Sequence, residues 1–374
     1  MIRVLQNNRG IALILTILVV SLIIAFTIQF NRTMLAHVIS SATNQNGLKA
    51  LYAAKSGISC ALAILKADDS PGVTTLFELK SKQKQEKTKI EDICGELEKL
   101  SPCSLGKFKP LENCEFEIID ECGKIQLNSL PAMEKPGNLD KDKGLDVESL
   151  LKRYLDQFDL EKDDGDKGGA GKFATVYAIL NWIDADDKNR GESGWDYSED
   201  SSKNRPLYSL RELRLIEGFS PEDLSDLTEP DETNPEEMGN SGKTDRFDSI
   251  IENLTVFVTN DGKININTAS LEVLMSLHEE MTEDMAAEIK AYRCGQAVNS
   301  AALKSTTWYD KDAHVDIKIP EELITTQSSL FRIVSTGSFG DLKKRVTAIV
   351  ERRDETKSKM EGELDFRILS WQVE

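Results

Sequence analysis

The residues best suited to chemistry are acidic side chains that crowd one short polar segment. They are Asp184, Asp186, Asp187, Glu192 and Asp196. Carboxylate oxygens are hard ligands, and a cluster of them favours Ca²⁺ over zinc or copper. The spacing does not fit an EF-hand loop, because Lys188 and Asn189 occupy positions where that loop needs Asp or Asn and then Gly. The sequence leaves two interpretations open, a calcium site and a solvated acidic loop.

Sulfur ligands gather in a second segment. Four of the six cysteines are close in sequence, namely Cys94, Cys103, Cys114 and Cys122. In an oxidising compartment such a group predicts disulfides, and four cysteines allow three pairings. Zinc is the alternative, but no Cys-x-x-Cys spacing is present. We therefore treat these four residues as disulfide candidates.

Other chemistry finds little support. His37, His278 and His314 are far apart, and the chain has no Gly-x-Ser-x-Gly, P-loop or dinucleotide fingerprint. We therefore do not expect an enzyme. The formal net charge of -18 also opposes binding to nucleic acid, because a polyanion repels an acidic surface.

The N-terminus carries the strongest signal for location. After Arg9-Gly10 an uncharged apolar run extends from Ile11 to about Phe30. About twenty such residues make a helix of about 30 Å, enough to cross a bilayer. Arg3 and Arg9 precede the run, so the positive-inside rule predicts a cytoplasmic leader and an exported body in the periplasm.

Three kinds of segment share this pattern. A cleavable secretory signal has an apolar region of about 7 to 15 residues, which is shorter than this one. A signal anchor that is not cut is the second possibility. The third is a type IV prepilin-like leader, which is cut after the glycine that precedes the apolar run, so that the helix stays in the mature protein. Gly10 followed by Ile11 has that form, and we favour it.

The elements that must position these residues include both helices and strands. No proline interrupts 11–66, and apolar residues recur every three or four positions in its second half, which predicts one long helix that is transmembrane to about residue 30 and then amphipathic. Alternating residues predict a hairpin of 114–120 with 124–127, and another of 330–335 with 345–350.

Between these strands the pattern becomes helical. Helical periodicity covers 145–158, 173–183, 209–216 and 269–277, while Ser209 with Glu212 forms a capping box and 220–223 carries a helix start. Strands before and after a helical block predict an α+β fold, in which a large α-helical domain is inserted into a small antiparallel sheet. The expected divisions are 1–10 for the leader, 11–66 for the helix, 67–128 with 325–374 for the sheet domain, and 129–324 for the insertion.

Several motifs in the same order carry a family resemblance. They are the leader Arg9-Gly10 before Ile11, DECGKIQLN at 120–128, LNWIDAD at 180–186, NRPLYSLREL at 204–213, ININTA at 264–269, and the closing strand pair. Together they resemble the minor pseudopilin K family of the type II secretion system over nearly the whole length.

The resemblance implies a role and partners. It implies that prepilin peptidase cleaves the chain after Gly10 and that the new amine at Ile11 is methylated. It then implies assembly at the pseudopilus tip with the minor pseudopilins I, J and H, on a platform in the inner membrane. Secreted proteins are a further class of partner that the resemblance suggests. It also implies calcium in the insertion, although Gly191-Glu192-Ser193 departs from the expected Gly-Ala-Glu.

One departure from other pseudopilins favours the tip. Pseudopilins generally carry Glu at the fifth position after the cleaved glycine, where it is thought to pair with the N-terminal amine of a neighbour, and this chain has Leu15 there. An unpaired carboxylate in a bilayer costs several kcal/mol, so a subunit with no neighbour above it is expected to lack it. The alternative function is a membrane-anchored, calcium-dependent periplasmic binding module that never enters a filament.

Overall fold

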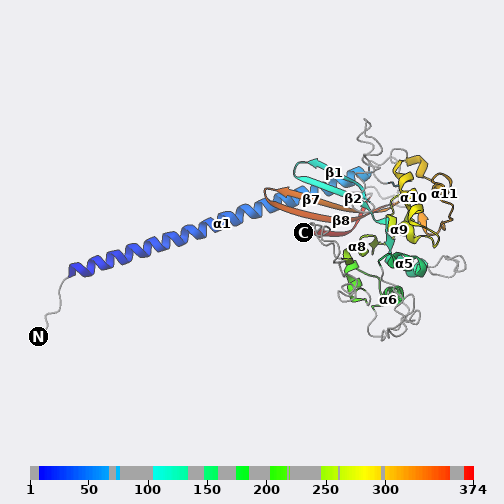
Figure 1. Cartoon of the computed structure of the whole chain (residues 1–374). Coiled ribbons are helices and arrows are strands. Elements are labelled where there is room, and N and C mark those ends of the chain that lie inside the picture. The colour runs from blue at the N-terminus through cyan, green and yellow to red at the C-terminus, as the bar shows by residue number, and fades with distance from the viewer. Residues whose placement is uncertain are drawn as a thin grey trace, which may run out of the picture.

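A single long helix leads into a compact head of sheet and helices in the computed structural model (Figure 1). The structure describes residues 8–66, 73–75, 104–133, 147–158, 174–184, 203–216, 219, 246–259, 262–295, 300–353 and 366–374. The helix extends from one side of the head and ends in it (Figure 1).

The long helix, α1 (Asn8–Lys66), has 59 residues and is about 90 Å long. Residues 10–45 are exposed, whereas the buried residues begin at Ala50. The buried side chains are spaced by three or four positions and face the sheet; they are Ala50, Ala54, Ile58, Ala61 and Leu65. The prediction of one helix over 11–66 is confirmed.

The sheet has five antiparallel strands. They are β1 (Ser104–Leu111), β2 (Cys114–Asp120), β7 (Leu330–Phe339), β8 (Leu342–Arg352) and β9 (Phe366–Val373), in the order β1-β2-β7-β8-β9. β7 and β8 form the predicted closing hairpin, and Gly340 takes a positive φ of 58° in its turn. Alternate residues of β2, β7 and β8 are buried beneath α1 in one apolar cluster.

β2 and β7 are neighbours in the sheet but are separated in sequence by residues 121–329, so this segment is an insertion into the sheet. The predicted α+β architecture is therefore confirmed. The insertion contains η1 (Glu121–Gly123), β3 (Ile125–Gln126), η2 (Leu127–Ser129), α4 (Leu130–Met133), α5 (Val147–Asp156), α6 (Ala174–Ile183), η4 (Leu210–Leu215), α8 (Arg246–Glu252), β4 (Leu254–Thr255), β5 (Ile264–Asn265), α9 (Leu271–Ser276), α10 (Glu283–Gly295), η6 (Ser300–Leu303), α11 (Trp308–Lys311) and β6 (Ile324–Thr325).

The insertion has its own apolar core, which is separate from the cluster beneath α1. Helices were predicted over 145–158, 173–183 and 269–277, and α5, α6 and α9 confirm them. The segment 209–216 forms a 3-10 helix, η4, and carries the predicted capping box of Ser209 and Glu212. The helix start predicted at 220–223 lies outside the described residues, and the predicted domain boundaries stay predictions.

The predicted hairpin of 114–120 with 124–127 is wrong. The hairpin partner of β2 is β1, and β3 pairs instead in parallel with β4. The reason lies at the end of β2, where the Asp120 side chain accepts a hydrogen bond from the Cys122 N–H at 2.8 Å and closes a 3-10 turn. That turn directs the chain into the insertion, where Ile125 is buried in the second core.

Two glycines bring α1 close to the sheet. A Cβ on Gly337 of β7 would collide with the backbone O of Ala50 and the backbone N of Ala54, both in α1. A Cβ on Gly57 of α1 would collide with the side chains of Ser335 and Cys114. Glycine at these positions therefore allows the helix and strand backbones to approach each other closely.

This contact predicts a position-specific cost. Gly337→Ala should lower the free energy of unfolding by about 1–3 kcal/mol, because the helix must move away from β7. Gly47→Ala is the matched control: its Cβ would have only Leu342 at 4.0 Å, and alanine favours helix. Denaturant unfolding of the full chain in detergent measures both. Equal stability of the two variants would contradict the contact.

Candidate functional site

The processing residues lie at the exposed start of α1. Gly10 is in the first turns of the helix, and among the described residues no atom outside its own stretch of helix lies within 4 Å of where its Cβ would be. Ile11, the predicted new N-terminus, is also exposed. Both residues belong to the N-terminal end of α1, which lies far from the head (Figure 1).

The first half of α1 fits a single-pass membrane anchor. Its most apolar 18-residue window has a mean hydropathy of 3.0, and none of that window is buried inside the protein. Its hydroxyl groups are satisfied within the helix, since Thr16, Ser21 and Thr27 each donate to a backbone carbonyl three or four residues earlier at 2.8 Å. No hydroxyl among these three needs water, which suits a lipid environment.

Apolar exposure continues beyond the length of a bilayer. Met34, Leu35, Val38 and Ile39 are exposed on α1 before it reaches the sheet, and Leu48 and Tyr52 are exposed where it packs. At 3.6 residues per turn Leu48 and Tyr52 lie on the face opposite to the stripe that packs on the sheet. α1 thus has two apolar faces, one buried in its own head and one free, and the free face is suited to packing against helices of other chains.

A buried polar junction holds the insertion to the sheet. The carboxylate of Asp120, at the end of β2, is fully buried and accepts hydrogen bonds from Cys122 N–H, Asn265 Nδ2 at 3.1 Å, Thr268 Oγ1 at 2.7 Å and Ser328 Oγ at 2.6 Å. Burial raises the pKa of Asp120, while these hydrogen bonds oppose the rise. Asp120 therefore connects the sheet to the β5 region and to the segment that returns to β7.

Glu121 adds an ionic half to the junction. Its carboxylate is fully buried and pairs with Arg332 Nε at 2.8 Å and Lys124 Nζ at 3.4 Å, while Thr255 Oγ1 donates to it at 2.5 Å. Burial alone would raise the pKa of Glu121, but the charges of Lys124 and Arg332 and the hydrogen bonds outweigh it and lower that pKa. Glu121 is thus held as an anion between β7 and β4.

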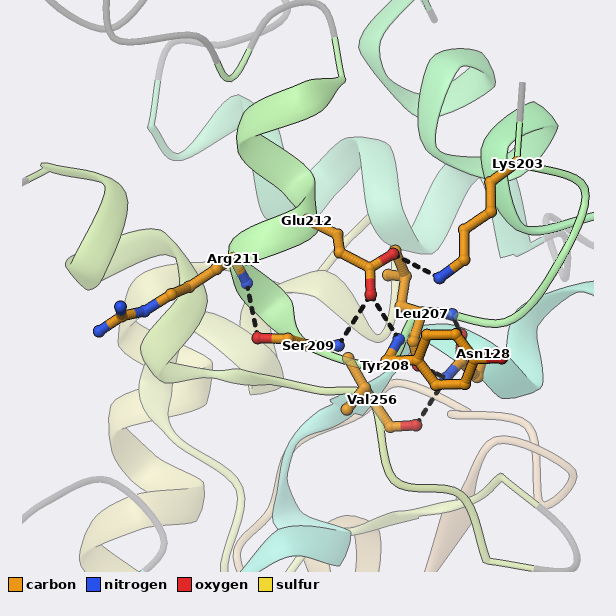
Figure 2. Close-up of polar contacts among 8 residues, drawn as sticks. All are labelled: Asn128, Lys203, Leu207, Tyr208, Ser209, Arg211, Glu212 and Val256. Carbon is orange, nitrogen blue, oxygen red and sulfur yellow. Dashed lines mark hydrogen bonds and ion pairs between the residues drawn. The ribbon is translucent and has the colours of Figure 1, made fainter. Parts of the chain in front are cut away.

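A second group of polar contacts lies within the insertion, around Asn128 and Glu212 (Figure 2). Asn128 Nδ2 donates to the carbonyls of Leu207 and Val256 at 2.9 and 2.7 Å, and its Oδ1 accepts from Leu207 N–H at 2.7 Å. Beside it, Glu212 Oε1 accepts from the Tyr208 and Ser209 N–H groups, as a capping box requires. One amide side chain therefore ties together three segments that are distant in sequence.

The structure describes only one of the five predicted metal ligands, Asp184. Asp184 is half-buried just after α6, and its N–H donates to Leu180 O at 2.9 Å. Asp186, Asp187, Glu192 and Asp196 lie outside the described residues. Among the residues that are described, no three His, Cys, Asp or Glu side chains gather as a metal site. Calcium stays a prediction.

The disulfide prediction is wrong for two of its four residues. Cys114 and Cys122 are free buried thiols. Cys114 Sγ lies 4.0 Å from Ser335 Oγ beneath α1, while Cys122 packs in a small cluster with Leu330 and Ile349, so each fills space in a core. Burial, and then the charge of Asp120, raises the pKa of the Cys122 thiol above its usual range, which favours the protonated thiol over the thiolate.

The other four cysteines differ from Cys114 and Cys122. Cys94 and Cys103 lie outside the described residues. Cys294, which the sequence did not single out, is disulfide-bonded, and Cys60 is an exposed free thiol on α1.

Sequence reasoning missed the junction as a structural unit. Asp120, Glu121 and Asn265 fall within motifs that carried the family resemblance, but no local pattern gave them a role. Their partners are distant in sequence: Ser328, which bonds to Asn265, is more than sixty residues away from it, and Arg332, which pairs with Glu121, is more than two hundred residues away. The signal that could have indicated this junction is a pair of adjacent acidic residues, Asp120 and Glu121, directly after an apolar strand.

No family model matches the chain, and neither does any curated protein. Among solved structures, the chain is similar to one in the crystal structure of the GspK-GspI-GspJ complex from the type 2 secretion system of enterotoxigenic Escherichia coli, with 14% identity and a TM-score of 0.49. The match covers 90% of this chain and 99% of that one.

The junction predicts unequal costs for two glutamates near β2. Glu121→Ala should destabilise the protein by about 3–5 kcal/mol, because it leaves Lys124, only 5% exposed, without its anion. Glu115→Ala removes an exposed pair with Lys107 and should cost at most about 1 kcal/mol. Denaturant unfolding of the full chain compares them. If Glu121→Ala lowered the free energy of unfolding as little as the control does, the junction would not stabilise the fold.

Proposed function

We propose that this chain is a minor pseudopilin of the type II secretion system that caps the tip of the pseudopilus and helps to start its assembly. It acts as a structural subunit in protein export across the outer membrane, not as an enzyme. Before assembly it is held in the inner membrane by one helix, with its head in the periplasm.

The observation that carries this proposal is the contrast along α1. The same continuous helix is buried on the sheet from Ala50 onward and bare over residues 10–45. A bare apolar helix of this length is not stable in water, so it requires lipid first and other apolar helices later. A subunit that moves from a membrane into a bundle of similar helices meets that requirement.

Two features support a place at the tip. Leu15 stands where other pseudopilins carry a glutamate for the neighbour above, and it is exposed and apolar. The insertion between β2 and β7 also enlarges the head, which packs poorly in a narrow repeating shaft but has free space at an end. Both features suit a subunit with neighbours only below.

The partners follow from this place. The chain is expected to assemble with the minor pseudopilins I and J and then H, after cleavage by prepilin peptidase and on the inner-membrane platform. Its head is then free to meet secreted proteins or the outer-membrane channel. Nucleic acid is not among the expected partners.

The competing function is a membrane-anchored periplasmic module that binds calcium and never enters a filament. The two functions differ at the N-terminus, because an anchor has no need to lose its leader. Cleavage after Gly10 would therefore support the filament subunit, and an uncut leader would support the binding module.

Processing gives the direct test. Mass spectrometry of the chain extracted from membranes should find Ile11 as the first residue, with one added methyl group. Gly10→Glu should leave the leader in place, whereas Ala12→Val, a neighbouring change that keeps the glycine, should be processed normally. An intact Met1 terminus in the wild-type chain would favour the competing function.

We also propose that the acidic segment around Asp184 and Asp186 binds calcium. Calorimetric titration of the full chain with Ca²⁺ should show saturable binding that Asp186→Asn weakens by about tenfold or more, because a hard cation loses a charged oxygen ligand. Mg²⁺ is the control, since it prefers a tighter octahedral site. Absence of binding heat, or equal binding by the variant, would contradict the calcium site.

A further inference from the structure

The face of the sheet that α1 covers is left open at one edge. The strand register gives a row across all five strands, which runs Phe108, Phe116, Ser335, Val346 and Val373. The first four are 9%, 1%, 0% and 0% exposed, whereas Val373 on β9 is 49% exposed. Burial therefore stops between β8 and β9.

Two further rows are also buried up to β8 and exposed at β9. Ile333 and Ala348 are fully buried, and the next residue in their row, Trp371 on β9, is 39% exposed. In the third row, Val350 is fully buried and its neighbour Ile368 is 49% exposed. Ile368, Trp371 and Val373 thus form one apolar strip, which we call the β9 strip.

The dimensions of the sheet explain the open strip. Five strands about 4.8 Å apart span about 19 Å between the outer strands, and one helix is about 10 Å wide. α1 packs mainly on β7, β8 and β2. The β1 side is closed, because Leu105 is buried and Phe108 stacks on Phe116 with ring centroids 5.1 Å apart. The space left on this face lies over β9.

β9 has two different faces. Arg367 and Gln372 lie on the other face of the strand, and Arg367 is paired with Glu351 at 3.2 Å. The exposed apolar side chains of β9 lie on the face that α1 shares, whereas Leu369 is partly buried on the other face against Leu330 and Ile349. Such segregation on an edge strand is typical of a surface that is covered in an assembly.

We propose that the β9 strip binds the long helix of a neighbouring subunit, through the part of that helix at the level of the heads, which lies beside α1 on the same face of the sheet. The inference rests on the proposed function, since that function supplies subunits with such helices. The strip continues the interface that α1 already makes with β7 and β8, so the second helix extends an existing helix layer. Trp371, at the middle of the strip, is the expected anchor.

A helix fits this surface better than an added strand. Strand addition uses the backbone groups at the outer edge of β9 and leaves the side chains of the strip uncovered by any layer. The exposed groups here are side chains that point to the face where the neighbouring strands carry a helix. Covering them therefore needs a second element in the plane of α1.

Photo-crosslinking tests the proposal with the full chain. A benzophenone amino acid is placed at position 371, or at 372 on the opposite face, and the chain is expressed in membranes with the I- and J-type minor pseudopilins. Position 371 should give an adduct that mass spectrometry locates in the N-terminal helix of a partner, and position 372 should not. An adduct in a partner strand, in a second copy's head or equally at both positions would overturn the proposal.

Substitution gives an independent test. Trp371→Glu should reduce the recovery of I- and J-type partners by about tenfold, because it places a charge under the docked helix. Gln372→Glu adds the same charge to the other face and should leave recovery unchanged. The unfolding midpoint of each variant checks that both remain folded.

The outcomes separate this inference from the proposed function. If the leader is removed and partners are recovered equally with Trp371→Glu and Gln372→Glu, the β9 strip is not the docking surface, although the chain is still a pseudopilin. If the leader is retained and no pseudopilin is recovered even with the wild-type chain, both proposals are wrong.

Discussion

The contact between α1 and the sheet is the constraint on which the rest of the molecule depends. It is unusually close, because Gly337 presents no side chain to the backbone of Ala50 and Ala54. This contact orients the helix with its second half on β7, β8 and β2 and leaves its first half without any cover from its own chain. Everything proposed for function follows from that division, since the uncovered half needs either lipid or other helices.

The second constraint is that a large insertion must leave and re-enter between two adjacent strands. The junction at Asp120 and Glu121 solves this with buried hydrogen bonds and ion pairs rather than with more apolar packing. Polar contacts of this kind are directional, so they fix how the insertion sits on the sheet. The apolar cores on the two sides remain separate, and the junction lies where the segments from both meet.

Local patterns predicted the elements whose signals are local. The proline-free run of α1, the alternation of 330–335 and the capping box at Ser209 all depend on residues within a few positions of one another, and all are confirmed. The hairpin of 114–120 with 124–127 failed because the Asp120 side chain closes a 3-10 turn at the end of β2, and partners distant in sequence hold Glu121 in that turn. The disulfide prediction failed at Cys114 for a similar reason, since Gly57 and Ser335 enclose that thiol. The acidic segment stays untested.

Taken together, the bare helix, the exposed Leu15 and the enlarged head describe a subunit that joins others from one end only. Electron microscopy of isolated pseudopili, with gold-labelled antibodies against the insertion, tests this most directly. The account predicts label at one end of each filament and none along the shaft. Label repeated at regular intervals along the shaft would contradict it.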